Sequence, residues 1–525
     1  MKFLFFSPHA DINRHAIPEA MVGEALQNEG HSISYLTCNG TFSKMCVAMS
    51  ARNLNEESSN KTKKNICKVC IEKKNLILER FKFKEIPIET LLTKKTHKEA
   101  IIFTNKHKQK DPKTIYFKKV PIGCYASYEF LLNWKLNSLK FSKKLAKYYA
   151  YHLYNCYLAI EAGRTLLKKQ QFDRIVSYNQ NYSINNCISS IFKKAKAEAF
   201  TINSGIHKKY RSTTITIDKN IQDRYALNTS CEWQKFSKEK LNSFQSKIAE
   251  EELKECKKAK DMWVYSKPFC KKQQKLIENR LKEKTKIITV CLSSFDERFA
   301  AQMIGVLPKN KKALFTSQKK WIYYIFNLAK TLPNYYFIIR VHPREFPNKR
   351  EQVTSRNLTF YQKIKINSPP NIWVNTPDEE VSLYNLIPIT DLCLNLTSSS
   401  GLEYLAEQKP VLGGNQQNLF AYPPEFNYSA RTKAEYKKLI VNLKRPKCSK
   451  EMIYKWIYFK TFMSAILIPD IWKNNKISII SKIKLFFLNR FAKKKTEKWI
   501  LKYKILLSKI PKTFKNQKKI AEAFS

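Results

Sequence analysis

The sequence predicts an α/β protein built from two doubly wound domains. The first observation is length, because 525 residues exceed the ~250–300 at which a single hydrophobic core stops growing. The second is an alternation of short buried strands and amphipathic helices in both halves of the chain. The third is that polar residues directly follow several of these strands, where open parallel sheets bind their ligands.

The first domain is predicted to span residues 1–270. Its strands are expected at residues 2–7, 31–37, 172–179 and 199–203, and its helices at 17–29, 142–170 and 184–196. Gly30 follows the first helix as a standard C-terminal stop. This β-α-β repetition is typical of a parallel sheet covered by helices on both faces.

The second domain is predicted at residues 287–450, after a linker at 271–286. A run of aromatic and β-branched residues at 335–341 reads as a buried strand, and it ends at His342-Pro343 because proline cannot extend the ladder. A second strand, at 389–396, runs into the serine cluster Thr397-Ser398-Ser399-Ser400-Gly401.

A short helix is predicted to follow the serine cluster. Ser400 and Glu403 have the S-x-x-E spacing of a capping box, so we expect Ser400 to be the N-cap. Hydroxyls and free backbone N–H groups at a helix start bind anions. Together with the imidazole of His342, they would suit a diphosphate or the phosphate of a sugar nucleotide.

The order of these motifs resembles a known family. Strand-His342-Pro343, Asp391 ahead of the serine cluster, Glu403, and the strand that starts near residues 409–411 are similar to the C-terminal donor domain of GT-B glycosyltransferases. The closest likeness is to the bacterial capsule-polysaccharide biosynthesis group. That group is related in pattern to bacterial sialyl- and Kdo-transferases and, more distantly, to wall teichoic acid polymerases.

Bacterial sialyltransferases share an acidic pair, an HP pair and an SS pair. Asp296-Glu297, His342-Pro343 and Ser398-Ser399 stand in that order in this chain. The resemblance covers the C-terminal half directly and the N-terminal half only by its general pattern.

The resemblance implies a GT-B-like fold of two Rossmann-like domains that face a cleft. It implies transfer of a sugar from a CMP- or UDP-linked donor to a growing surface polysaccharide or a lipid-linked acceptor, without a metal ion or further cofactor. The residues implied to bind the donor and its phosphates are Arg340, His342, Pro343, Arg344, Thr397, Ser398, Ser399, Ser400, Gly401 and Glu403. For Glu403, a contact to donor hydroxyls and the capping role both stay open.

A general base for the acceptor hydroxyl is expected from the first domain in this family. The loop after the first strand and the helix that follows supply the proton acceptors Asp11, His15 and Glu19, and a histidine with a pKa near ~6.5 suits proton transfer at neutral pH best. Asp296 and Glu297 are further candidates, although the sialyltransferases carry their acidic pair in the other domain. The alternative for His15 is a packing role.

Four cysteines, Cys38, Cys46, Cys67 and Cys70, are low-ranked candidates for a structural zinc site. Cys67 and Cys70 form a C-x-x-C pair, but Cys38 and Cys46 are spaced more widely than the usual ~2–4 residues. Free, reduced thiols are the simpler interpretation, since no secretory signal precedes them.

The net charge of +53 would ordinarily suggest a nucleic-acid or membrane partner. Here the lysines are spread along the whole chain, together with many Asn and Ile and only 10 Gly, which is typical of a general compositional drift. We therefore do not expect nucleic acid to be a partner.

The C-terminal end is predicted as a crossover helix at residues 451–472 and a basic amphipathic tail at 473–525. Such a tail suits an anionic inner-membrane surface, and a solvated helix packed on the C-terminal domain is the alternative. No run reaches the ~18–20 apolar residues of a transmembrane helix. The expected location is the cytoplasm, with peripheral attachment to the cytoplasmic membrane face as one interpretation.

Two other functions stay open. A nucleotide-sugar epimerase would share the fold and need no acceptor. A non-catalytic protein that binds membranes or nucleic acid would account for the charge.

Overall fold

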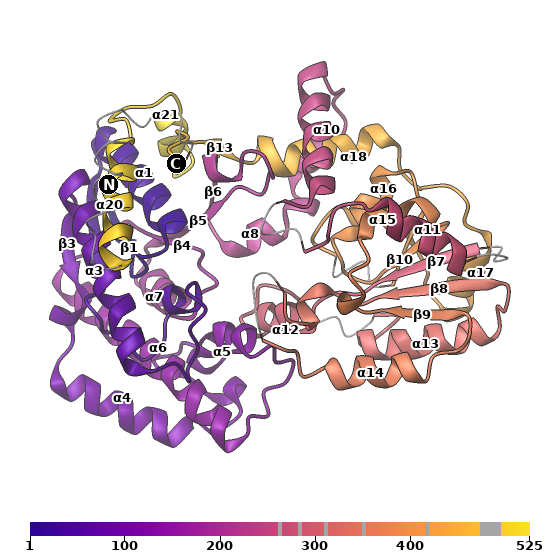
Figure 1. Ribbon diagram of the computed structural model, residues 1–525. Helices are drawn as coiled ribbons and strands as arrows, with labels where there is room; N and C mark the ends of the chain where they lie inside the picture. The colour runs from indigo at the N-terminus through magenta and orange to yellow at the C-terminus, as the bar shows by residue number, and fades with distance from the viewer. Residues whose placement is uncertain (261–264, 282–285, 309–312, 349–352, 415–418, 473–494) are drawn as a thin grey trace.

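The computed structural model describes residues 1–260, 265–281, 286–308, 313–348, 353–414, 419–472 and 495–525. It contains two parallel-sheet domains, each with helices on both faces of its sheet, and the C-terminal segment lies back on the first domain beside the N-terminus (Figure 1). The predicted pair of doubly wound domains is therefore confirmed.

The first sheet has seven strands in the order β13-β6-β5-β4-β1-β2-β3. They are β1 (Lys2–Phe6), β2 (Ser32–Thr37), β3 (Lys84–Pro87), β4 (Arg174–Tyr178), β5 (Glu198–Ser204), β6 (Thr214–Asp218) and β13 (Ile466–Leu467). β1 pairs in parallel with β2 and β4, whereas β6 runs antiparallel to β5.

Successive side chains of β1 enter two different cores, as the alternation of a strand requires. Phe3 and Phe5 pack under one helical layer, while Leu4 and Phe6 pack under the other. The first layer contains α1 (Asn13–Asn28), α3 (Asn60–Phe81), α20 (Lys495–Ser508) and α21 (Gln517–Glu522). The second contains α5 (Ile122–Asn133), α6 (Lys143–Lys169) and α7 (Ser183–Lys194), with α4 (Lys94–His107) outside it.

The second sheet has six strands in the order β12-β11-β10-β7-β8-β9, and all of its pairs are parallel. They are β7 (Lys286–Cys291), β8 (Tyr335–Arg340), β9 (Ile372–Asn375), β10 (Leu392–Asn395), β11 (Val411–Gly413) and β12 (Tyr428–Ser429). One face packs on α13 (Gln318–Lys330), α14 (Leu358–Ile366) and α17 (Lys433–Asn442). The other packs on α15 (Leu383–Ile389), α16 (Ser400–Ala406) and α18 (Lys450–Tyr458).

Several helices lie at or near the junction of the two domains. α9 (Cys231–Phe236) and α10 (Ser243–Lys258) share a hydrophobic core with α16 and α18 of the second domain. α11 (Lys271–Arg280), where the sequence predicts a linker, packs through Ile277 near Leu386 of α15. The remaining described α-helices are α2 (Val47–Ser50), α8 (Ile221–Tyr225) and α12 (Phe295–Met303).

The chain returns to the first domain after α18. β13 pairs with β6. Tyr503 and Leu507 of α20, and Phe524 just after α21, are buried in the core beside β1. Residues 473–494 of the predicted tail lie outside the described residues. The described remainder of the tail packs on the first domain rather than on the C-terminal domain. Its core residues there are Tyr503, Leu507, Ile510, Ile520 and Phe524.

Candidate active site between the two domains

A cavity of about 550 Å³ lies between the domains, at the carboxyl edge of the second sheet. The second domain contributes Cys291, Leu292, Arg340, His342, Pro343, Ser398, Ser399, Ser400, Leu402 and Glu403. The first domain contributes Lys208, Arg211, Thr216, Asp218, Arg224 and Tyr225, and a third wall comes from α10, α18 and the turn after α18. Its volume falls within the range of small-molecule sites.

His342 lies directly after β8, and its protonation state follows from its contacts. Nδ1 accepts a hydrogen bond from the Arg344 backbone N–H at 3.2 Å, and burial lowers the pKa of the ring to about 3. The ring is therefore neutral at pH 7 with its proton on Nε2. In this tautomer His342 can donate a hydrogen bond to an anion without itself carrying charge.

Arg340 supplies a fixed positive charge at the same strand end. Its guanidinium donates to the Val381 carbonyl at 2.9 Å, to Asn375 Oδ1 at 3.1 Å and to Ser266 Oγ at 3.3 Å. Burial lowers its pKa, yet a guanidinium stays protonated in proteins. These contacts hold the charge in one position at the cavity wall.

The serine cluster is held in place by Asn395, the last residue of β10. Its side chain donates to the Ser398 carbonyl and accepts from the Ser398 N–H, both at 2.8 Å, and it also donates to the Tyr422 hydroxyl at 2.7 Å. A Cβ on Gly401 would lie 2.0 Å from that hydroxyl and 2.4 Å from Asn395 Nδ2. Gly401 therefore acts by permitting this close approach, and it does not line the cavity.

The capping box predicted for this helix is wrong. α16 begins at Ser400, its N-cap is Ser399, and no side chain caps it. The Ser400 hydroxyl instead contacts the Ser398 hydroxyl at 2.8 Å. Because α16 has only 7 residues, the hydroxyl groups matter more here than the helix dipole.

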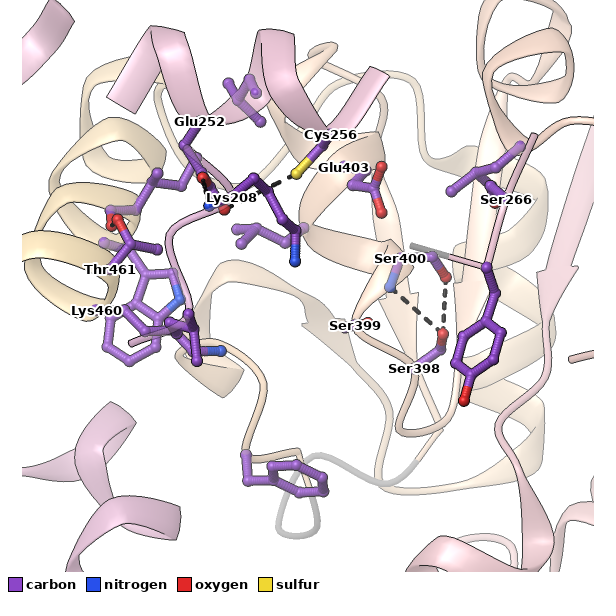
Figure 2. A pocket seen from close by; sticks show the side chains of 18 of the residues that line it. Lys208, Glu252, Cys256, Ser266, Ser398, Ser399, Ser400, Glu403, Lys460 and Thr461 are labelled. Carbon is purple, nitrogen blue, oxygen red and sulfur yellow. Dashed lines mark hydrogen bonds between the residues drawn. The ribbon is translucent and has the colours of Figure 1, made fainter. Parts of the chain in front are cut away.

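Glu403 lines the cavity, away from any capping position (Figure 2). Its Oε2 is buried with no hydrogen-bond partner in the described part of the chain, and burial raises the pKa of the carboxyl group. A buried acceptor without a donor favours a ligand that brings one, such as a hydroxyl group.

Arg344 and Asp296 form a buried ion pair and do not line the cavity. Their side chains are 2.8 Å apart, and Arg344 also donates to the Leu132 carbonyl of α5 at 3.2 Å. Arg344 and Asp296 are thus held in an ion pair within the second domain, and Arg344 contacts the first domain through Leu132, so the structure does not place Arg344 at the phosphates or Asp296 as a base in the cavity. Glu297 lies 3.7 Å from the same guanidinium, also outside the cavity.

Thr397, another predicted donor contact, faces the sheet. Its hydroxyl lies 2.9 Å from Ser293 Oγ, at the end of the neighbouring strand β7. It ties two strand ends together and is not among the cavity-lining residues.

Asp11 and His15, two base candidates of the first domain, lie away from the cavity. Asp11 is buried and accepts hydrogen bonds from Arg52 at 2.8 Å and from Lys73 at 2.7 Å, so both of its oxygens are occupied. His15 stacks on Tyr178 with ring centroids 4.1 Å apart, and burial lowers its pKa to about 3. Asp11 is held in buried ion pairs and His15 packs on Tyr178, so neither prediction of a base is retained.

The four cysteines do gather in space. Cys38, Cys46, Cys67 and Cys70 line a small cavity of about 20 Å³, and burial raises the pKa of Cys38 to about 12 and that of Cys70 to about 11. Among the described residues, however, no three His, Cys, Asp or Glu side chains are placed to hold a metal ion. The zinc hypothesis is therefore not carried further.

Sequence reasoning missed six charged residues that line the cavity: Lys208, Arg211, Asp218, Arg224, Glu252 and Lys460. Lys208 comes shortly after the strand predicted at 199–203, and this position near a strand end could have indicated a site residue. Lys460 lies on a π-helical turn, Phe459–Met463, and no sequence pattern predicts such a turn. Burial lowers its pKa to about 7, and it donates to the Ala421 carbonyl at 2.5 Å.

Figure 2 shows Lys208 and Lys460 on one side of the space and the three serines on another, with Glu403 between them. The cavity thus offers hydrogen-bond donors at the strand ends and positive charge on the opposite wall.

Within the described part of the chain, no helix is long and apolar enough to cross a bilayer.

Comparison with known proteins gives matches only among solved structures. No protein-family model and no curated protein matches the chain. A β-Kdo 2,4 transferase, KpsC of Thermosulfurimonas dismutans, is similar with a TM-score of 0.33 at 11% identity, over 54% of this chain and 78% of that one. A β-Kdo 2,7 transferase, KpsC of the same organism, gives 0.31 at 14% identity, over 63% and 90%.

A putative UDP-N-acetylglucosamine 2-epimerase from Listeria monocytogenes is similar over 94% of this chain and 98% of its own, with a TM-score of 0.21 at 9% identity. The similar structures thus include two Kdo transferases and a putative epimerase. Because these scores are low, the function proposed below rests on the cavity and its side chains.

Proposed function

We propose that this protein is a metal-independent glycosyltransferase that uses a nucleotide-sugar donor. The observation that carries the proposal is the cavity of about 550 Å³ between two doubly wound domains, lined by His342 after β8 and by Ser398–Ser400 after β10, the two strands that flank β7. The proposed acceptor is a surface polysaccharide or a lipid-linked glycan, in line with the sequence resemblance.

The proposed mechanism is electrostatic. The donor phosphates accept hydrogen bonds from His342 Nε2–H and from the serine hydroxyls, close to the fixed charge of Arg340. As the bond between the sugar carbon and the phosphate oxygen breaks, negative charge grows on the phosphate, and these preorganised groups stabilise it. Glu403 accepts a hydrogen bond from a donor hydroxyl.

The test is a binding titration of CMP, UDP and GDP with the wild type and with His342→Ala. One nucleotide should bind, and the substitution should weaken it at least about 10-fold, because a charge-assisted hydrogen bond is worth about 1.5–3 kcal/mol. His107→Ala, a histidine on α4 outside the cavity, is the matched control and should leave the affinity unchanged.

Equal binding by His342→Ala, or no binding of any nucleotide by the wild type, would contradict the proposal. Turnover of a nucleotide-sugar into an isomer without any acceptor would instead identify an epimerase.

A further inference from the structure

The proposed transfer needs a group that removes the proton of the attacking hydroxyl. The phosphate-binding wall belongs to the second domain, so an acceptor must approach from the side on which the first domain lines the cavity. His15 and Asp11 are excluded because they lie outside the cavity. The proton acceptor must therefore be sought among the side chains that line it.

Four lining side chains carry a carboxylate or an imidazole: Asp218, Glu252, His342 and Glu403. His342 belongs to the phosphate wall, and burial leaves it a very weak base. Glu403 lies on α16 directly beyond the serines. Glu252 accepts the Lys208 backbone N–H at 2.6 Å and lies 3.4 Å from His207 Nδ1, so it is already engaged.

Asp218 is the one lining carboxylate of the first sheet among the described residues. It ends β6, and its contacts all involve Oδ2: Thr216 Oγ1 at 3.2 Å, Asn203 Nδ2 at 3.5 Å and Arg224 Nη1 at 3.6 Å. Within the described residues no hydrogen bond reaches Oδ1. The carboxylate is thus fixed through one oxygen while the other is available to a ligand.

We propose that Asp218 is the catalytic base of this site, on the premise of the glycosyltransferase function proposed above. The acceptor oxygen bonds to the sugar carbon, and the bond from that carbon to the phosphate oxygen breaks with its electron pair passing to the nucleotide. The hydroxyl proton passes to Asp218. No oxidant, reductant or metal ion enters this balance.

The surroundings of Asp218 suit this task. Burial raises its pKa, and Arg224 opposes that shift, as do the hydrogen bonds from Thr216 and Asn203, while nearby Asp223 adds to it. A carboxylate with a raised pKa is a stronger base and is better matched to proton transfer near neutral pH. The acidic limb of a kcat/KM profile should therefore lie above the ordinary aspartate pKa of about 3.9.

The experiment compares the wild type with Asp218→Asn and Asp218→Glu in the full chain. The donor is found by offering the wild type a panel of sugars linked to the nucleotide that binds, with nucleotide release as the readout. Asp218→Asn should bind the nucleotide within about 3-fold of the wild type, lose at least about 100-fold in release, and lose the acidic limb. Asp218→Glu should keep part of the activity.

Addition of azide distinguishes a catalytic base from a residue with a structural role. Azide is an anionic nucleophile that carries no proton, so its attack on the sugar carbon needs no base. Azide should restore nucleotide release by Asp218→Asn, with formation of the glycosyl azide. Asp378→Asn is the matched control, since Asp378 is exposed on the turn Pro377–Glu379 and lies outside the cavity lining, and it should stay within about 2-fold of the wild type.

Release by Asp218→Asn within 3-fold of the wild type, or no rescue by azide, would overturn the assignment while leaving the proposed function in place. Loss of nucleotide binding in Asp218→Asn would also overturn it and would indicate a binding role. A wild type that binds no nucleotide, or turns over no sugar of the panel, would overturn the proposed function and this inference together.

Discussion

The carboxyl edges of the two sheets carry similar residues in very different surroundings. His15 follows β1 of the first sheet and His342 follows β8 of the second, and burial lowers the pKa of each to about 3. His342 lines a cavity of about 550 Å³, whereas His15 is stacked on Tyr178.

The difference comes from what packs on each edge. At the first edge, Lys73 of α3 and Arg52 neutralise Asp11, and the surrounding side chains close the space. At the second edge, no described side chain pairs with Glu403 Oε2, and the serine hydroxyls lie on the cavity wall. Polar residues at a strand end are therefore not sufficient for a binding site. Whether the space beside them stays accessible to a ligand depends on the side chains that neighbouring segments pack there.

The largest expected effect comes from breaking the ion pair that closes the first edge. Lys73→Met should lower the free energy of unfolding by about 3–5 kcal/mol, because it leaves Asp11 buried with one partner fewer. Urea unfolding measures this change. Nucleotide affinity at the second edge should not change.

The control for Lys73 is Lys209→Met, which breaks a solvent-exposed pair with Glu251 at the same N···O distance of 2.7 Å. Surface pairs contribute less than about 1 kcal/mol, so this variant should unfold close to the wild type. Equal losses in the two variants would show that the first edge is not sealed by a buried pair.

Glu19, beside the closed edge, gives a pH-dependent effect. Ser7 Oγ donates to its Oε2 at 2.8 Å, Oε1 is buried without a partner among the described residues, and burial raises the pKa from 4.5 to about 8. Between these values the folded chain holds a proton that the unfolded chain releases. Stability from this group is thus fully present below pH 4.5 and is lost as the pH rises through 8.

Glu19→Gln should remove this loss, so the variant should exceed the wild type in unfolding free energy at pH 9, on the order of 3 kcal/mol, and match it near pH 4.5. Glu29→Gln, exposed at the end of the same helix, should show no such difference. Parallel stability curves of wild type and Glu19→Gln from pH 4.5 to 9 would contradict the buried, protonated carboxyl group.

The strands, and the polar residues at the carboxyl edge of the second sheet, could be predicted from the sequence. Buried strands followed by Pro343 or by the serines fix where β8 and β10 end, since a ladder cannot continue through proline. The residues that close the first edge could not be predicted from the sequence. Arg52 and Lys73 pair with Asp11 from positions more than 40 residues away, and no local sequence pattern encodes such a pairing.

Two local features were also misread from the sequence. The helix predicted at residues 17–29 starts earlier in the structure: α1 begins at Asn13, so His15 lies on the helix, and Pro18 is accommodated inside it. Asp218 was missed although Thr214-Ile215-Thr216-Ile217 alternates polar and apolar residues, a pattern typical of a half-buried strand. That alternation, followed by a carboxylate, was the available signal.

The smallest expected effect tests the comparison most directly. His15→Ala should cost only about 0.5–1.5 kcal/mol of stability, the worth of a stacked aromatic pair beyond its burial, and should leave nucleotide affinity within about 2-fold of the wild type. His342→Ala should do the reverse, with lost affinity and little change in stability. Calorimetry measures the nucleotide affinity of each variant, and urea unfolding measures its free energy of unfolding. If His15→Ala weakens nucleotide binding as much as His342→Ala does, the first edge takes part in the site, and the contrast between a closed and an open edge is wrong.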